Sequence, residues 1–297
     1  MSNKLRKMTL EKKHNLTGWA FLAPATFLIA VFSFWPMIKA LVLSFQTGKG
    51  RNMQMAGFTN YIRMFQDDVF IQSIKNTFFY FILQVPIMLV VAMVLACILN
   101  KKDLRFKGFF RTMIFLPCTT SLVAYAIIFR SLFANDGLVN YVLVNLGILD
   151  KPYNFLTQPF AAKMVIILGL LWRWTGYNMV FFLSGLQNIE YSVYEAAKID
   201  GASAIQTFFK ITVPLLKPTI LLTAIMSTNG TLQLFDESIN LTDGGPANAS
   251  ISMSHYIYNL CFKYVPNFGY AAAMSFFILL LVAVLAFIQM RVGDKRD

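Results

Sequence analysis

The residues of this chain that could carry chemistry lie within two largely apolar segments. The first reads Trp172-Arg-Trp-Thr-Gly-Tyr-Asn178, and the second reads Ser227-Thr-Asn-Gly-Thr-Leu-Gln-Leu-Phe235. Polar and ionisable groups are costly within a bilayer, so they usually face the interior of a helix bundle or a water-filled path. Both segments are therefore candidates for a polar pathway. Aromatic residues also mark membrane interfaces and polar side chains also join helices, so a purely structural role stays open for each residue.

Arg173 stands out because a full charge in an apolar segment needs a partner or access to water. It could snorkel to the outer interface, or it could serve as a gating or helix-pairing residue. We favour pairing, with Asp236 or Glu237 as the expected partner.

No combination of residues has the spacing of a known catalytic or metal site. We find no His-Glu-x-x-His, no Gly-x-Ser-x-Gly and no paired deep aspartates, which disfavours an intramembrane enzyme. The absence of a Gly-x-x-x-x-Gly-Lys-Ser/Thr loop indicates that the chain does not hydrolyse ATP alone. Cys97, Cys118 and Cys261 show no paired spacing and are interpreted as small apolar fillers. The sequence predicts no catalytic residue, no metal and no cofactor.

Segment 190–214 is unlike a simple connector, because it is rich in helix-forming residues. We expect short helices at 193–199 and 202–210, with Gly201 between them in the left-handed conformation that favours glycine. Pro214 is expected to open the helix that follows. Such a helix–turn–helix could dock a soluble partner or lie on the membrane surface, and the residue types alone favour neither.

The elements that must position these residues are membrane-spanning helices. The chain has 297 residues, of which 57% are hydrophobic and 13% charged, with a mean hydropathy of +0.58. A span needs about 20 apolar residues in helical conformation. We therefore expect an all-α integral membrane protein with a single transmembrane domain over 1–297. The six expected spans are 19–45, 76–99, 109–133, 161–186, 213–235 and 268–290. Segment 138–149 is too short to span and is expected to be interfacial or re-entrant.

The net charge of +12 follows this topology, so lipid rather than nucleic acid is the expected partner. Basic residues gather at both ends of the chain and in the loop after the second span, which the positive-inside rule places in the cytoplasm. Segment 190–214 falls on the same side. The residues concerned include Lys4, Arg6, Lys7, Lys12, Lys13, Lys101, Lys102, Arg105, Lys107, Arg111, Arg291, Lys295 and Arg296.

The spacing within segment 190–214 resembles the EAA loop of ABC-importer permeases. The matching positions are Glu195-Ala-Ala197, Asp200-Gly-Ala202 and Ile211-x-x-Pro214, with Val213 where the family usually has leucine. Other stretches are similar to compact six-span sugar permeases of the maltose-permease MalF-like class, and together they cover most of the chain. These stretches are Gly57-Phe-Thr-Asn-Tyr61, Phe115-Leu-Pro117 and Leu241-Thr-Asp-Gly-Gly-Pro-Ala-Asn-Ala-Ser250.

The resemblance implies a subunit of a bacterial plasma-membrane importer for a sugar, expected to be a disaccharide or short oligosaccharide. It implies a second homologous permease subunit, two ATPase subunits and an external sugar-binding protein as partners. It also implies that the EAA loop couples ATPase closure to helix movement. The expected coupling residues are Glu195, Ala196, Ala197, Asp200 and Gly201.

With a sugar as the implied substrate, the two polar segments become the expected sugar path. Amides and hydroxyls beside flat aromatic faces suit a sugar, and the candidate contacts are Trp174, Tyr177, Asn178, Asn229, Thr231 and Gln233. One helical face cannot hold Asn229, Thr231 and Gln233 together, so Gly230 is expected to loosen the helix there. The alternative function is a stand-alone secondary transporter, which needs coupling carboxylates deep in the spans that we do not clearly find.

Overall fold

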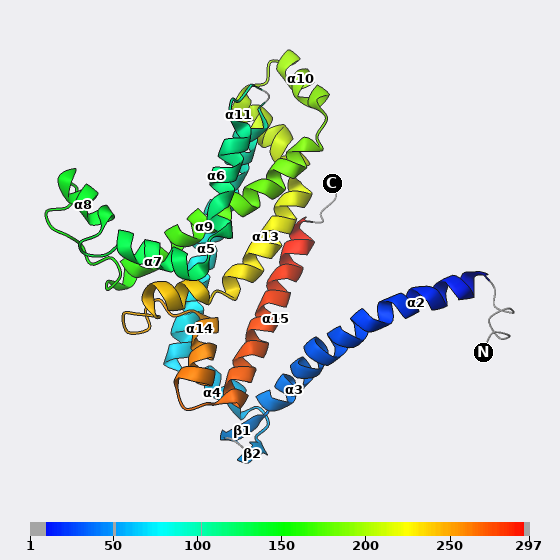
Figure 1. Cartoon of the computed structure of the whole chain (residues 1–297), viewed down its shortest axis with the longest axis vertical. Coiled ribbons are helices and arrows are strands. Elements are labelled where there is room, and N and C mark those ends of the chain that lie inside the picture. Colours follow the sequence, from blue (N-terminus) through cyan, green and yellow to red (C-terminus); the bar gives the residue numbers. More distant parts are fainter. Residues whose placement is uncertain (1–9, 50–51, 102, 294–297) are drawn as a thin grey trace.

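The computed structural model describes residues 10–49, 52–101 and 103–293. Apart from one short hairpin, the regular elements in these ranges are helices, many of them long and side by side (Figure 1). The basic residues Lys4, Arg6, Lys7, Lys102, Lys295 and Arg296, used above to orient the chain, lie outside the described residues.

Four long apolar helices of the described chain could each cross a membrane. Two further pairs of helices pass the same test, although each pair is sharply bent, so up to six crossings are present. This agrees with the expected all-α membrane fold. The first long helix, 14–44, consists of most of α2 (Leu10–Ile29) together with η1 (Ala30–Phe34) and α3 (Trp35–Ser44). The other three are α5 (Asp68–Asn100), α9 (Pro159–Gln187) and α15 (Phe268–Gly293).

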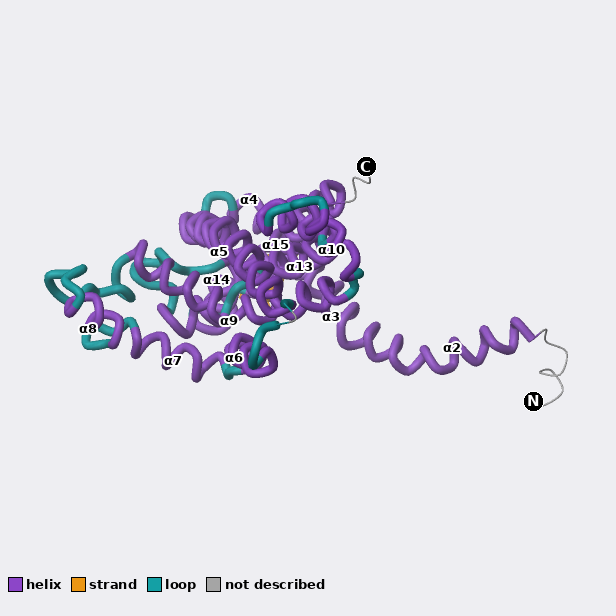
Figure 2. The backbone as a smooth tube through the Cα atoms, turned by 90° about the horizontal axis from the view of Figure 1, so that it is seen from above, coloured by secondary structure: helices purple, strands orange, loops and turns teal. Residues whose placement is uncertain are grey.

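The first long helix begins at Leu10, before the start expected from hydropathy. Its π-helical turn η1 lies directly before Pro36, whose ring would clash with the preceding turn of a regular α-helix. Its C-terminal part α3 packs on α15, whereas α2 projects away from the bundle in both views (Figures 1 and 2). The described side chains of α2 are exposed.

Helix α5 also begins earlier than expected, because Asp67 caps it. The carboxylate of Asp67 accepts hydrogen bonds from the amides of Val69 and Phe70 at 3.0 and 3.1 Å. Pro86 lies within α5 without ending it. Helix α9 begins with Pro159 in its first turn, where proline costs no hydrogen bond.

The third expected span is not one continuous helix. It is divided into α6 (Lys107–Thr119) and α7 (Leu122–Leu132), which differ in direction by 98°. Pro117 lacks an amide donor in the last turn of α6, and the extended Ser121 then caps α7 by accepting from the amide of Ala124 at 3.3 Å. Periodic hydropathy cannot reveal this bend, because both halves are apolar.

The fifth expected span is shorter than its apolar run. Helix α12 (Val213–Leu215) stops at Leu216, and α13 (Lys217–Leu232) continues at an angle of 71° to the preceding segment. Pro214 lies in the first turn of α12, as expected, and Pro218 lies in the first turn of α13 after the bend. Helix α13 also runs unbroken through Gly230, so the expected loosening at that glycine is not found.

The remaining elements connect the long helices. The polypeptide passes from α3 through the hairpin of β1 (Gln46–Lys49) and β2 (Asn52–Met55), where Gln46 pairs with Met55. Short helices then link the longer ones. These are α4 (Thr59–Met64), α8 (Leu138–Asn145), α10 (Tyr191–Ile199), α11 (Ala204–Thr207), η2 (Phe208–Thr212), η3 (Ser238–Thr242), α14 (Met253–Tyr258) and η4 (Asn259–Lys263).

The core of the bundle is the packing of α5 against α9, with α6 on α9 and α13 against both α5 and α15. Gly176 permits the approach of α6, because an added β-carbon would lie 1.9 Å from the carbonyl oxygen of Ile114. Small residues allow such close contacts between membrane helices. The two polar segments on α9 and α13 are thereby held on helices that share the partner α5.

Candidate functional site

A cavity of about 510 Å³ lies between α5, α7, α9, α13 and the segment that follows α13. This volume is within the range of small-molecule sites. Both polar segments singled out in the sequence contribute to its wall. The residues that line it and were expected as substrate contacts are Trp174, Tyr177, Asn178, Thr231 and Gln233.

Amide and hydroxyl groups join three helices at this cavity. The hydroxyl of Thr231 on α13 donates to the side-chain oxygen of Gln84 on α5 at 2.8 Å. Ser227 of α13 donates to the side-chain oxygen of Asn178 on α9 at 3.3 Å. Gln84 and Thr231 are 2% and 5% exposed. These groups can break their hydrogen bonds to one another and form hydrogen bonds with a hydroxylated solute instead.

Aromatic rings form another part of the wall. Trp174 and Tyr177 meet edge to face with ring centroids 5.8 Å apart, and Phe235 also lines the cavity. Trp172 lies instead against Tyr125, with the rings stacked at 6.0 Å. Flat apolar faces beside hydrogen-bonding groups suit amphipathic ring compounds.

Asn229 is the expected contact that does not line the cavity. It is exposed, and its side-chain oxygen accepts a hydrogen bond from the amide of Gln233, which does line the cavity. Because α13 is a regular helix up to Leu232, positions 229 and 231 point in different directions. Asn229 therefore acts on the cavity only through Gln233.

Gln84 is a cavity residue that sequence reasoning missed. It is a lone amide in the otherwise apolar middle of α5, which was the available signal. Its relation to Thr231, 147 residues away in sequence, depends on helix packing and could not be read from either segment alone.

Arg173 lines the cavity but does not form the expected ion pair. The ion pairs found among the described residues involve neither Arg173 nor its expected partners Asp236 and Glu237. The guanidinium lies over the rings of Tyr125 and Trp174, 5.7 and 5.4 Å from their centroids. Arg173 is 7% exposed, and its Nε and Nη1 have no hydrogen-bond partner in the described chain. Cation–π contact therefore replaces the expected salt bridge in this conformation.

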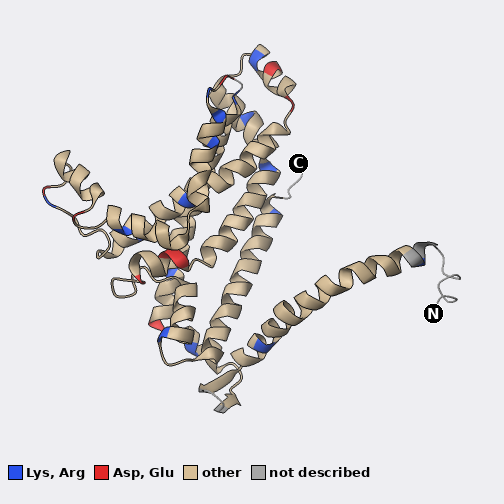
Figure 3. Ribbon diagram, viewed as in Figure 1, with Lys and Arg blue, Asp and Glu red and all other residues tan. Residues whose placement is uncertain are grey.

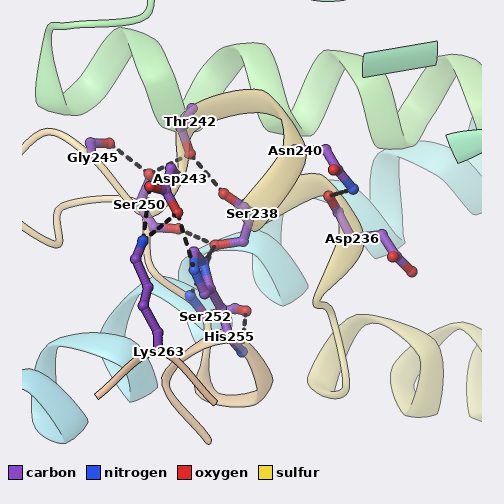
Figure 4. A network of polar contacts seen from close by, with 10 residues as sticks. All are labelled: Asp236, Ser238, Asn240, Thr242, Asp243, Gly245, Ser250, Ser252, His255 and Lys263. Atoms are coloured by element: carbon purple, nitrogen blue, oxygen red, sulfur yellow. Dashed lines mark hydrogen bonds and ion pairs between the residues drawn. The ribbon is translucent and has the colours of Figure 1, made fainter. Parts of the chain in front are cut away.

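The segment that carries Asp236 and Glu237 is held by a buried network of hydrogen bonds (Figure 4). The hydroxyl of Ser238 contacts Nδ1 of His255 at 2.9 Å and donates to the carbonyl oxygen of Ser250 at 3.1 Å. Thr242 donates to the carbonyl oxygen of Ser238 at 3.0 Å. These contacts join η3 to the start of α14, so they fix the cavity wall at the end of α13.

This network contains serine, histidine and aspartate, but it is not arranged for nucleophilic catalysis. Ser238 and His255 are fully buried, and Nε2 of His255 lies 3.7 Å from Oδ1 of Asp243. Burial lowers the pKa of His255 to about 4, against the opposing field of Asp243. The histidine is therefore neutral near pH 7 and serves as a structural link.

The second candidate site is the helix–turn–helix formed by α10, α11 and η2. Gly201 separates α10 from α11 with a φ of +76°, as expected. The amide of Ala202 donates to the carbonyl oxygen of Ala197 at 2.9 Å, which closes the end of α10. A capping box then starts α11, in which Ser203 and Gln206 each accept a hydrogen bond from the other's backbone amide.

The bounds of these helices differ from those expected. Helix α10 begins at Tyr191, two residues before the expected start, and the second helix begins at Ala204 and continues through η2 into α12. The sequence did not reveal the capping box as the starting point of the second helix.

The residues expected to couple to a partner are mostly turned outward. Glu195, Ala196, Asp200 and Gly201 are exposed, whereas Ala197 is 6% exposed and packs inward. Large apolar side chains surround them on the same projecting unit, which lies at the far end of the bundle from the β-hairpin (Figure 1). These exposed side chains include Ile199, Ile205 and Phe209, at 86%, 72% and 64%.

Charged side chains are sparse along the long helices (Figure 3). Long apolar helices that surround a cavity with amides, hydroxyls and aromatic rings in its wall define a multi-pass membrane protein.

Residues 70–296 match the family described as "Binding-protein-dependent transport system inner membrane component", and the chain belongs to this family. It is 51% identical to the lactose transport system permease protein LacF of Rhizobium radiobacter, over 98% of each chain. It is 31% identical to the arabinooligosaccharides transport system permease protein AraP of Halalkalibacterium halodurans, over 96% of this chain and 90% of that relative.

The fold is also similar to solved structures of a transporter. One is described as a bacterial ABC transporter involved in the import of the acidic polysaccharide alginate. It matches with a TM-score of 0.83 and 25% identity over 95% of this chain and 96% of that chain. A second structure shows the alginate transporter in complex with a periplasmic protein bound to an alginate pentasaccharide, with the same TM-score and 26% identity.

Proposed function

We propose that this chain is a permease subunit of an ATP-driven importer and forms half of the transmembrane pathway for a disaccharide or short oligosaccharide. The observation that carries the proposal is the cavity between α5, α9 and α13. Its wall combines amides, hydroxyls and aromatic rings, which together suit a polyhydroxylated ring. The relatives named for lactose and arabinooligosaccharides support this class of substrate.

In this proposal the contacts to the sugar come from both polar segments. Trp174 and Tyr177 offer aromatic faces, and Asn178, Thr231 and Gln233 offer hydrogen bonds. Asn229 orients Gln233, and Arg173 and Asp236 act in gating through electrostatics rather than through a direct ion pair. A sugar that enters would compete for the hydrogen bonds that join the three helices.

The helix–turn–helix of α10 and α11 is the proposed docking unit for a separate ATPase. Glu195, Ala196, Asp200 and Gly201 would meet the ATPase surface, and Ala197 would hold α10 in place. Glu195 could accept charge-assisted hydrogen bonds from the partner. ATP hydrolysis would take place in two such partner subunits, and their closure would move α10 as a rigid body.

The other proposed partners complete the importer. A second homologous permease would supply the other half of the pathway, and an external binding protein would deliver the sugar. The excess of basic residues in alternate loops supports a cytoplasmic location for both termini and the docking unit in a bacterial cell. The transmembrane domain would extend over the whole chain.

The test of the proposal is a comparison of two glycine variants in tagged protein purified with its partners. Gly201 and Gly147 both have left-handed backbones, with φ of +76° and +70°, and a β-carbon at either meets no atom within 4 Å. Gly201→Asp should therefore leave the chain inserted while placing a carboxylate on the docking surface. Gly147→Asp makes the same change beside α8, far from the docking unit.

We expect wild type and Gly147→Asp to retain a second permease and an ATPase, and to drive uptake that stops when ATP is depleted. Gly201→Asp should lose the ATPase and uptake together. Normal uptake by Gly201→Asp would refute the coupling assignment. Recovery of the wild-type chain without partners, with uptake driven by ion gradients, would instead support the secondary transporter.

A further inference from the structure

The charged residues of the cavity bear on which substrates it accepts, because they attract or repel charged groups of a solute. Arg173, Asp236 and Glu237 line the cavity, and its other lining residues are uncharged at neutral pH. The ionisable groups of the wall are therefore two acidic side chains and one guanidinium. A charge that faces a low-dielectric cavity acts more strongly on a bound solute than the same charge in water.

Arg173, the positively charged residue of this group, is only partly accessible from the cavity. Nε and Nη1 of Arg173 are inaccessible, and the guanidinium lies over the rings of Tyr125 and Trp174. The guanidinium is thus in contact with aromatic faces and within electrostatic range of Glu237, but it forms no ion pair with either acid. Arg173 is therefore poorly placed to receive an anionic group of a solute in this conformation.

The negative members are differently placed. Glu237 is 4% exposed, so its carboxyl group lies in the wall itself, where burial raises its pKa against the opposing effects of Arg173 and a hydrogen bond with Trp174. Asp236 is half-buried, and its carboxylate forms no hydrogen bond or ion pair with any other described residue. Only its main-chain carbonyl is engaged, by the amide of Asn240 at 2.9 Å. Figure 4 shows the Asp236 side chain pointing away from the hydrogen-bonded cluster around Ser238.

A free carboxylate beside aromatic rings can accept hydrogen bonds from sugar hydroxyls, and such charge-assisted bonds are stronger than neutral ones. The same group repels a carboxylate on the solute. A similar fold is found in a transporter involved in the import of an acidic polysaccharide, so the fold alone does not exclude acidic saccharides. Discrimination must come from the side chains of the cavity.

We propose that Asp236, next to the buried Glu237, makes this cavity selective for uncharged saccharides and against saccharides that carry a carboxylate. The inference rests on the proposed function, since it concerns the sugar pathway of the same importer. It assigns Asp236 a direct role as a hydrogen-bond acceptor for the sugar and a role in specificity through repulsion.

The experiment uses the complete importer in proteoliposomes, with two disaccharides that differ only in a hydroxymethyl group oxidised to a carboxylate. Each is presented at saturating concentration on the same binding protein, whose affinity for both is measured separately. The quantity compared is the ratio of neutral to acidic uptake, for wild type, Asp236→Asn, and Asp236→Asn combined with Glu237→Gln. Asp136→Asn, an exposed acid outside the cavity, is the matched control.

Because the binding protein is the same throughout, any change in the ratio between variants reports the permease. We expect the ratio to fall about threefold in Asp236→Asn, at least as far in the double variant, and to stay unchanged in Asp136→Asn. Asp236 is half-buried, so the Asp236→Asn importer should fold. A ratio within twofold of wild type in this variant would overturn the inference. The proposed function would still stand if the importer takes up sugar. Absence of uptake of either sugar by the wild-type importer would overturn both.

Discussion

The contact between α6 and α9 at Gly176 predicts that a single methyl group will loosen the packing of α6 on α9, the helix that carries Trp174, Tyr177 and Asn178. In Gly176→Ala the β-carbon would lie 1.9 Å from the carbonyl oxygen of Ile114 and 2.7 Å from its carbon. Both are backbone atoms, so relief requires a shift of α6 by roughly 1.5 Å to reach ordinary contact. Overpacking of this kind costs about 1–3 kcal/mol, and the rigid backbone partner places Gly176→Ala near the upper end.

The matched control is Gly230→Ala, the same change on α13. A β-carbon there meets no atom within 4 Å, and α13 is regular through this position. Alanine should therefore stabilise the helix by about 0.5–1 kcal/mol, because glycine loses more conformational entropy on folding. The two variants should shift stability in opposite directions although their chemistry is identical.

The measurement is the thermal midpoint of the purified importer in detergent, followed through the loss of folded permease. With a shift of about 2 °C per kcal/mol for a chain of this size, Gly176→Ala should lower the midpoint by about 4–6 °C. Gly230→Ala should raise it by about 1–2 °C. A midpoint for Gly176→Ala within 1 °C of wild type would show that α6 does not approach α9 this closely, and the described packing of these two helices would then be wrong.

Two further predictions concern Asp67 at the start of α5 and His255 in α14. Asp67 caps α5 and accepts hydrogen bonds from the hydroxyls of Tyr256 and Tyr270, both at 2.7 Å. Asp67→Asn should therefore lower the free energy of unfolding by about 1–3 kcal/mol. Asp68→Asn, on the exposed neighbour, should leave the midpoint unchanged in the same thermal assay. His255 has a pKa lowered to about 4 by burial, so the unfolded chain binds its proton first as the pH falls. The stabilisation from the neutral ring, about 3 kcal/mol at most, should be complete above about pH 6.5 and lost between pH 6.5 and 4. His255→Asn should flatten this part of the pH profile, and an unchanged slope would show that His255 is not its cause.

The amino-acid sequence determined the class of the protein through local composition. Hydrocarbon cannot hydrogen-bond to the backbone, so a long apolar run must be helical wherever it crosses the membrane. This reasoning needs no knowledge of neighbouring helices, and it predicted the long apolar helices α5, α9 and α15. The left-handed turn at Gly201 was equally local, because only the backbone of that residue and its immediate neighbours set the conformation.

The bounds of the helices were harder to predict from the sequence, because capping and bending depend on a few side chains within apolar stretches. Asp67 extends α5 beyond the hydropathic run, and the pair Pro117 and Ser121 divides α6 from α7. Hydropathy treats such residues as minor interruptions. Their effect on direction is nevertheless large, since α7 turns by 98°.

Only the tertiary structure decided which polar residues meet. Gln84 bonds Thr231 because α5 packs beside α13, and Asn229 is turned away because one helical face cannot hold it together with Thr231. Arg173 lies over aromatic rings rather than beside an acid, because Tyr125 comes from α7 after the bend. A sequence specifies the polarity of each position, but the partner of a buried polar group depends on the approach and rotation of separate helices, which packing alone sets.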